Sequence, residues 1–366
     1  MTALMLTELI GIEHSIIQAP MAGGTTTPEL VAAVSNAGAL GSLGAAYLTP
    51  EQIAKTVAEI RRLTRRPFCV NLFVSPPPPP PGSWDAGAIL AFLSEHYAAV
   101  GLQAPEIPTS FAPDAEGQWA AVLAERVPVF SFTFGVPDPA VIAPFQAGGT
   151  RVFGSATTVA EARQLVAAGV DGVIAQGSEA GAHRATFGGD FERALIGTLA
   201  LVPQVVDAVD LPVVASGGIM DGRGIVAAEA LGAAGVQLGT AFLTTDEAGT
   251  SAIYREALVR ARDDQTVITR AFSGRPARGI INAFIEQMSA PGAPDPLPFP
   301  VQNALTSPMR RAAAQQDDAE RLALWAGQGV PLARAGGAGE LVARLVNERL
   351  TVLEALARRR DRTPAE

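Results

Sequence analysis

The sequence predicts an α/β fold, a (β/α)8 TIM barrel with a smaller lid subdomain after strand eight. Two observations lead to this prediction. Short apolar runs alternate with helical patterns along residues 1–245, and there are eight such runs. In addition, no GxGxxG fingerprint follows any run, which disfavours the open doubly wound sheet that the same alternation would otherwise permit. We therefore expect residues 1–245 to form the barrel.

The eight runs are nearly continuous in apolar residues, which is typical of parallel strands buried on both faces. We expect each run to be one strand of the barrel. Along the chain the runs are SIIQAP (15–20), LGSLG (40–44), FCVNLF (68–73), VPVFSFTFG (127–135), RVFGSA (151–156), DGVIAQG (171–177), PVVASGG (212–218) and GVQLGTAF (235–242).

Helix start and stop signals lie between the runs. The Thr-Pro pairs at 27–28 and 49–50 each join a capping residue to a proline at the first helical position. Thr158 followed by Glu161 predicts a capping box, in which each side chain accepts a hydrogen bond from the other residue's N–H. Gly169 stands where that helix should end.

The chain after the eighth run does not continue the alternation. Residues 246–300 contain the helical pattern TSAIYREALVRAR, the segment FSGRPARGIINAF and a proline-rich stretch, which we interpret as a lid or substrate-side subdomain over the barrel mouth. We expect residues 301–366 to be a helical C-terminal segment that packs on the barrel. After the third run, PPPPPPG (76–82) predicts a stiff polyproline spacer in a surface loop.

Composition excludes several partners and chemistries. The net charge of −9 argues against nucleic acid or an anionic membrane as a partner. Cys69 is the only cysteine and the N-terminus has no signal-peptide pattern, so we expect a cytoplasmic protein without an internal disulfide. Lys55 is the only lysine and lies on the polar side of a helical pattern, which excludes Schiff-base, pyridoxal phosphate and P-loop enzymes. The three scattered histidines give no zinc-type spacing, so no metal site is predicted.

Glycine-rich turns follow the seventh and eighth runs, at the end of the barrel where active sites form. SGGI contains Gly217 and Gly218, and QLGT ends at Thr240. Glycines let backbone N–H groups approach an anion closely, and a hydroxyl adds a donor, so the two turns together predict a phosphate site. The alternative is that the glycines only make tight turns.

Four polar residues lie at the ends of the third and sixth runs or in the loop after the sixth, at the same end of the barrel. Asn71 and Gln176 carry amides that suit the edge of a heteroaromatic ring such as a flavin, and the alternative that they bond to loop backbone stays open. His183, in the loop QGSEAGAHR, is a candidate general base. A loop histidine can also be an ordinary surface residue. Glu179 either orients His183 or is solvated.

Several segments together resemble the nitronate monooxygenase family, formerly called 2-nitropropane dioxygenases, and within it the class I enzymes. The segments are QAPMAGGTTTPELVAAVSNAGALGSLG, FCVNLF, VFSFTFG, AQGSEAGAHR, ASGGI, QLGTAFL, SGRPARG and LWAGQG. The resemblance implies a barrel enzyme with FMN as its cofactor. The residues it implies for FMN binding are Pro20, Met21, Ala22, Asn71, Gln176, Gly181, Gly217, Gly218, Gln237, Leu238, Gly239 and Thr240.

The resemblance also implies a reaction. Enzymes of this class oxidise alkyl nitronates such as propionate 3-nitronate with O₂ and release nitrite and a carbonyl product. It implies His183 as the catalytic base. For a neutral nitroalkane this base would remove the α-proton, whereas a protonated His183 would hold an anionic nitronate by a charge-assisted hydrogen bond. Besides the nitronate or nitroalkane and O₂, a homodimer is left open as a partner.

An FMN- and NAD(P)H-dependent enoyl-acyl-carrier-protein reductase is the main alternative, because it has a very similar loop before the histidine and a similar SGGI segment. AGGTTTP and SFTFG favour the monooxygenase. A non-redox barrel acting on a sugar phosphate is a more distant alternative.

Two departures from the family pattern bear on substrate preference. Ala182 stands where the family loop often has a second glycine. The segment before LWAGQG has Phe299, Asn303 and Ser307, without the Tyr and Lys that class I members often carry there.

Overall fold

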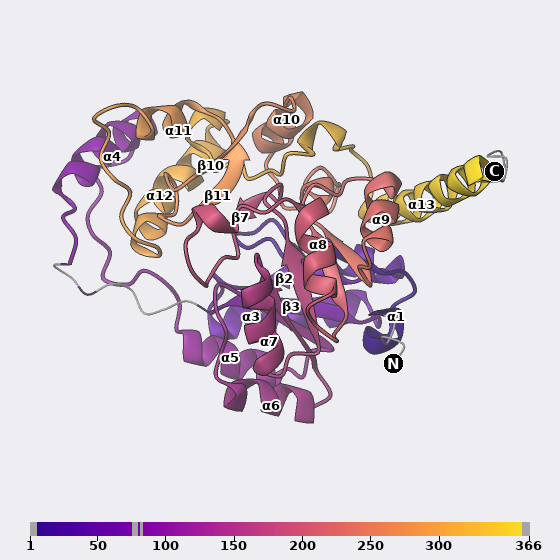
Figure 1. Ribbon diagram of the computed structural model, residues 1–366. Helices are drawn as coiled ribbons and strands as arrows, with labels where there is room; N and C mark the ends of the chain where they lie inside the picture. Colours follow the sequence, from indigo (N-terminus) through magenta and orange to yellow (C-terminus); the bar gives the residue numbers. More distant parts are fainter. Residues whose placement is uncertain (1–5, 75–79, 81–82, 361–366) are drawn as a thin grey trace.

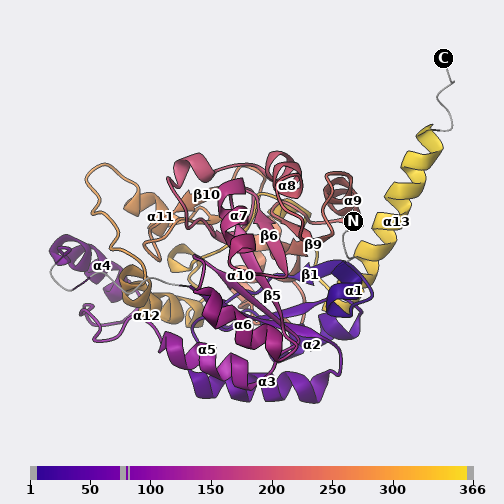
Figure 2. The ribbon, with the colours of Figure 1, turned by 60° about the horizontal axis from the view of Figure 1, so that its bottom comes forward.

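The computed structural model describes residues 6–74, 80 and 83–360. Its central feature, seen in Figures 1 and 2, is an eight-stranded parallel sheet in the order β1-β9-β8-β6-β5-β4-β3-β2. Backbone hydrogen bonds of 2.9 Å from Gln18 to Leu40 and from Leu40 to Ile16 link the two outer strands, so the sheet curls into a barrel. The strands are β1 (Ile16–Gln18), β2 (Gly41–Gly44), β3 (Phe68–Phe73), β4 (Val129–Thr133), β5 (Arg151–Ala156), β6 (Gly172–Gln176), β8 (Val213–Ser216) and β9 (Gly235–Leu238).

All eight predicted strands are present, which confirms the barrel. Several strands end before their apolar runs do, because residues such as Pro20 and Gly217 already belong to the loops at the barrel mouth. The proline run at 76–82, apart from Pro80, lies outside the described residues.

Helices cover the outside of the barrel in Figures 1 and 2. The first, α1 (Leu6–Ile10), packs Leu6 and Ile10 among the side chains that fill the amino-terminal end of the strands. The others are α2 (Pro28–Asn36), α3 (Pro50–Leu63), α5 (Ala115–Ala124), α6 (Pro139–Ala147), α7 (Val159–Ala167), α8 (Thr198–Val206) and α9 (Gly222–Ala230).

The helix caps follow the predicted signals with one exception. Thr27 accepts a hydrogen bond from the Leu30 N–H, and Thr49 forms a capping box with Gln52. Thr158 accepts from the Glu161 N–H as predicted. The second half of that capping box is absent, because the buried Glu161 carboxylate instead accepts from the Thr157 N–H and from the loop N–H groups of residues 187 and 188. Glu161 therefore fastens α7 to the loop that follows His183.

A second hydrophobic core lies beside the barrel mouth, where Figure 1 shows α4, α11 and α12 gathered together. Residues 246–330 supply most of it. The helix after β3 also joins it, with Leu93 and Tyr97 buried against Phe284 and Leu305. The predicted boundaries at 245 and 300 remain predictions. The elements are α4 (Gly87–Ala99), α10 (Ala252–Arg260), β10 (Thr266–Thr269), β11 (Ala277–Ile280), α11 (Ala283–Met288) and α12 (Val301–Gln315).

The last helix, α13 (Ala338–Arg360), packs its first half against α9 and α2, and its second half projects away from the body in both views. Leu341 and Leu345 are buried, whereas Leu350, Leu353 and Leu356 are exposed. Within the described part of the chain, no helix has the length and apolarity needed to cross a membrane.

Candidate active site

A cavity of about 650 Å³ opens at the carboxyl ends of the barrel strands, where α12 and the 322–329 segment complete its walls. It is the space in which the predicted site residues meet. All residues predicted to bind the cofactor line it except Leu238, whose side chain is 1% exposed and lies in the barrel core. His183 also lines this cavity.

The turns after β8 and β9 form a cradle of unpaired N–H groups. Gly217 and Gly218 have φ angles of 118° and 71°, which side chains other than glycine rarely adopt. A Cβ at Gly217 would also lie 2.9 Å from Thr198 Oγ1. Among the described residues, the N–H groups of Gly218, Gly239 and Thr240 have no hydrogen-bond acceptor. All three residues line the cavity, and backbone N–H groups left unpaired at a cavity wall are available to bind an anion.

The side-chain amides of Asn71 and Gln176 form hydrogen bonds within the protein. The Asn71 amide nitrogen donates to Ser131 Oγ at 2.9 Å. The Gln176 amide donates to the His183 carbonyl at 3.1 Å and accepts from the Ala185 N–H at 2.8 Å. Gln176 therefore bonds to backbone groups of the loop, which was the alternative to contact with a ring. Because both amides line the cavity, contact with a ring stays a prediction.

His183 lies on a short strand, β7 (Ala182–His183), which was not predicted. This strand pairs antiparallel with β11, where Ala277 lies opposite His183. Arg278 on β11 donates to the Ser178 carbonyl through Nε and Nη2. β11 therefore contacts the loop around His183 at two places, through its pairing with β7 and through the hydrogen bonds from Arg278 to Ser178. Ala182 has a left-handed φ of 59°, which explains why glycine suits this position.

The imidazole of His183 makes one hydrogen bond, 2.8 Å from Nε2 to Ser273 Oγ. The Ser273 hydroxyl also lies 3.0 Å from the Arg275 carbonyl, so its one proton goes either to that carbonyl or to Nε2, and the tautomer of His183 decides which. Aromatic rings surround the imidazole, with centroid distances of 5.6 to 6.4 Å to Phe73, Phe134, Phe299 and Trp325.

Burial lowers the pKa of His183 to about 3, and the positive charges of Arg275 and Arg310 add to the lowering. His183 is therefore neutral near pH 7. The neutral form has the free lone pair that a general base needs, but a pKa this low makes it a weak base. It speaks against the protonated His183 expected to hold an anionic nitronate.

Glu179 has neither of its two predicted roles. Its carboxylate accepts from the Thr198 N–H at 2.9 Å and from the Thr198 hydroxyl at 2.8 Å. Thr198 begins α8, so Glu179 caps the positive end of that helix. It shapes the loop between β6 and His183 without orienting the imidazole.

Many residues that line the cavity were missed by the sequence analysis, and four missed residues at the site bear most on its chemistry. Tyr47, Arg310 and Arg311 line the cavity, and Ser273 bonds to His183. Burial raises the pKa of Tyr47 to about 12, so its phenol stays neutral. Ser273 lies in the quoted FSGRPARG segment, but nothing in its spacing points to His183. Arg310 follows Ser307 by nearly one helical turn, and only the helical period of this segment could have suggested it.

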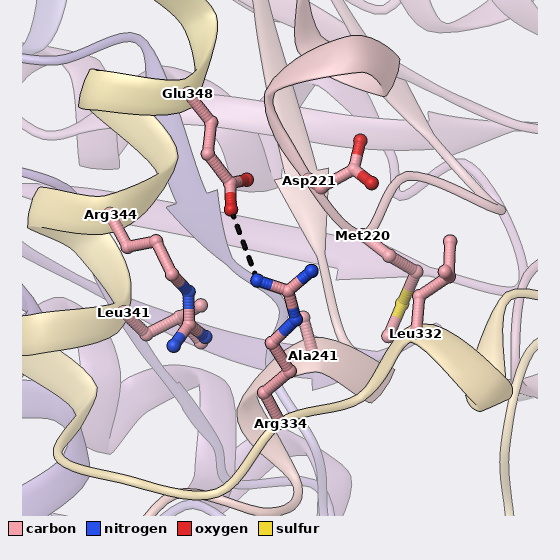
Figure 3. A pocket seen from close by; sticks show the side chains of 8 residues that line it. All are labelled: Met220, Asp221, Ala241, Leu332, Arg334, Leu341, Arg344 and Glu348. Atoms are coloured by element: carbon pink, nitrogen blue, oxygen red, sulfur yellow. Dashed lines mark hydrogen bonds and ion pairs between the residues drawn. The ribbon is translucent and has the colours of Figure 1, made fainter.

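A second, much smaller pocket of about 10 Å³ is lined by Met220 and Asp221 and by side chains of α13 such as Glu348 (Figure 3). Met220 lines both spaces. In the small pocket the Arg334 guanidinium meets Glu348 at 3.3 Å. This space holds about one water molecule, so the larger cavity is the candidate active site.

Comparison with known proteins identifies the family. The nitronate monooxygenase family model matches residues 4–348. A probable nitronate monooxygenase of Staphylococcus aureus (strain Newman) is 42% identical over 344 residues, which cover 94% of this chain and 96% of that protein. A solved nitroalkane oxidase from Streptomyces ansochromogenes is 44% identical with a TM-score of 0.88, covering 96% of this chain and 99% of that one.

FabK from Thermotoga maritima, also solved, is 30% identical with a TM-score of 0.76, covering 97% of this chain and 99% of that one. The family model spans nearly the whole chain, and the identities of 42% and 44% extend over the same length. The chain therefore belongs to the nitronate monooxygenase family.

Proposed function

We propose that the protein is an FMN-dependent nitronate monooxygenase of class I, which oxidises alkyl nitronates with O₂ and releases nitrite and a carbonyl product. The observation that carries the proposal is the placement of an anion cradle and a neutral histidine in one cavity. Family membership supports nitronates as the substrates. Propionate 3-nitronate is the substrate we would test first.

The cavity residues fit FMN. The unpaired N–H groups of Gly218, Gly239 and Thr240 would bind the phosphate, as backbone donors at a helix start do. The Thr240 hydroxyl already accepts from the Gly327 N–H at 2.9 Å, which leaves its own proton free to donate. Pro20, Met21, Ala22, Asn71, Gln176, Gly181 and Gln237 would line the rest of the cofactor. When bound, FMN supplies the oxidant that takes electrons from the nitronate and passes them to O₂.

The protein's own residues favour an anionic substrate. A base with a pKa of about 3 is a weak acceptor for the α-proton of a neutral nitroalkane. A nitronate needs no such proton transfer. The cations Arg275 and Arg310, whose charges lower the pKa of His183, stabilise an anion at the same place. The aromatic rings around His183 make its surroundings apolar, which strengthens that attraction. We therefore expect higher kcat/KM for nitronates than for the parent nitroalkanes.

Oxygen consumption tests the proposal. Purified protein should carry flavin absorbance, consume O₂ with propionate 3-nitronate and release nitrite, and should consume none with NADH alone. The enoyl-acyl-carrier-protein reductase alternative predicts the opposite pattern: rapid NADH oxidation with a crotonyl thioester and no O₂ uptake with the nitronate. A protein that remains colourless after incubation with FMN would overturn the cofactor assignment.

A further inference from the structure

One face of α12 forms a wall of the cavity. Asn303, Ser307 and Arg310 all line it, and their spacing of four and three residues places them on the same side of a helix. Arg310 is the charged member of this face. Arg311, its neighbour along the chain, lies at the exposed rim of the cavity, where its Nη1 is 3.3 Å from Ser307 Oγ.

The guanidinium of Arg310 is only partly satisfied by the protein. Its Nη2 donates to the Asn303 carbonyl at 3.1 Å and to Asn303 Oδ1 at 2.9 Å. Its Nε is buried without a partner. Within the described part of the chain, Nη1 donates to no acceptor and no carboxylate pairs with Arg310.

The two most buried arginines among the described residues, Arg184 and Arg278, have most of their N–H groups bonded to the protein. Arg184 also has a buried Nε without a partner, but its two Nη atoms donate to the carbonyls of Gly177, Gln176 and Ala194. Arg278 has the Ser178 carbonyl and the Thr266 hydroxyl. Neither of these two arginines lines the cavity. Arg310 does line it, and among the described residues its guanidinium donates only to Asn303. Arg275 also has a buried Nε without a partner and a single acceptor, the Thr186 carbonyl, but its guanidinium lies 3.9 Å over the Phe134 ring and it does not line the cavity.

Removing a guanidinium from water without a counter-charge is costly, because desolvation is then not offset by attraction to an anion. Burial lowers the pKa of Arg310, but a guanidinium stays protonated in proteins. The described residues that line the cavity include no Asp or Glu; Tyr47 keeps its phenol proton and His183 is neutral, so neither supplies a negative charge. An anionic ligand could therefore bind the Arg310 guanidinium without displacing another anion from it.

We propose that Arg310 is the residue that binds an oxyanion of the substrate, a planar nitronate or carboxylate group. Nη1 is the donor left for a ligand, because Nη2 is bonded to Asn303 and Nε is buried; a charge-assisted hydrogen bond from Nη1 to an oxygen of the anion is the contact we infer. Arg311 at the rim adds positive charge at the entrance, which favours entry of anions. The naming of the nitronate rests on the proposed function, whereas the binding of an oxyanion does not.

Steady-state kinetics with two substrates test this role. We expect Arg310→Gln to raise KM about 10- to 100-fold, as loss of a hydrogen bond to a charged group does, and Arg310→Lys to restore part of it. Arg260→Gln is the matched control, because it removes the same charge from an exposed site outside the cavity. A rise with both propyl 1-nitronate and propionate 3-nitronate places the nitronate on Arg310. A rise with propionate 3-nitronate alone places the carboxylate there. An unchanged KM with both substrates in Arg310→Gln overturns the proposal.

Calorimetric titration with propionate separates this inference from the proposed function, because propionate carries a planar oxyanion and needs no turnover. Binding to the wild-type protein that is lost in Arg310→Gln and kept in Arg260→Gln supports the inference even if no nitronate is oxidised. Equal binding by wild type and Arg310→Gln, or none by wild type, refutes it even if nitronates are oxidised. Thermal melting of each variant checks that it is folded, and Arg310→Lys replaces Arg310→Gln if the latter is not.

Discussion

The depressed pKa of His183 leads to a prediction about stability and pH. The ring titrates at about 3 in the folded protein, against an ordinary value of 6.5. Between these two values the unfolded chain binds a proton that the folded chain does not. The free energy of unfolding therefore falls as the pH falls through this window, and it is unaffected by His183 above the upper value. Replacing His183 with glutamine removes this contribution.

The size of the effect follows from the two pKa values. At pH 5.0 the unfolded imidazole is almost fully protonated and the folded one almost fully neutral. The wild-type protein should therefore lose about 2 kcal/mol between pH 7.5 and pH 5.0 that His183→Gln does not lose. Comparing wild type with the variant cancels the other groups, including His96, whose pKa burial also lowers.

Urea unfolding of both proteins at the two pH values measures this difference. The ring signals in NMR spectra give a direct check, because the chain has three histidines and the variant identifies one of them. The His183 signal should stay constant from pH 8 to pH 5. A midpoint near 6.5 in that titration, together with parallel pH dependence of the two proteins, would refute the neutral His183 on which the substrate argument depends.

Three further substitutions test the site. His183→Ala should retain FMN but lose activity on neutral nitroethane at least 100-fold, as loss of a general base does; loss of the flavin on purification would show a structural role instead. Gly218→Val forces a β-branched residue into φ of 71° beside the cradle, so it should purify without flavin absorbance, and a fully yellow variant contradicts the phosphate assignment. Ala182→Gly removes a left-handed alanine and should raise the free energy of unfolding by about 0.5 to 1 kcal/mol; a lower value in urea unfolding argues against strain there.

The barrel and its mouth could be predicted because both follow from short-range patterns. An apolar run reports a buried strand directly, and eight parallel strands bring their carboxyl ends together whatever the loops contain. For the same reason residues as distant as Asn71 and Gly239 could be placed at one cavity before any contact was known. Gly217 and Gly218 were recognisable since their φ angles require glycine.

The partners of the polar side chains could not be predicted in this way. Glu179, Gln176 and Glu161 each bond to backbone groups that become neighbours only after folding. The strand that carries His183 pairs with β11, nearly a hundred residues later, and no local periodicity marks a strand of this length. The hydrogen bond between His183 and Ser273 depends on that pairing.

The electrostatic organisation of the site was the least accessible to sequence, and it bears most on function. One imidazole cannot both accept a proton and bind an anion through its own positive charge at the same pH. In this protein burial keeps His183 neutral, and a permanent charge comes from Arg310 on a helix outside the barrel. That charge also contributes to keeping His183 neutral, so the two roles depend on each other. Removing Arg310 should therefore weaken anion binding and raise the pKa of His183 together, and NMR titration of Arg310→Gln can measure the second effect without any substrate.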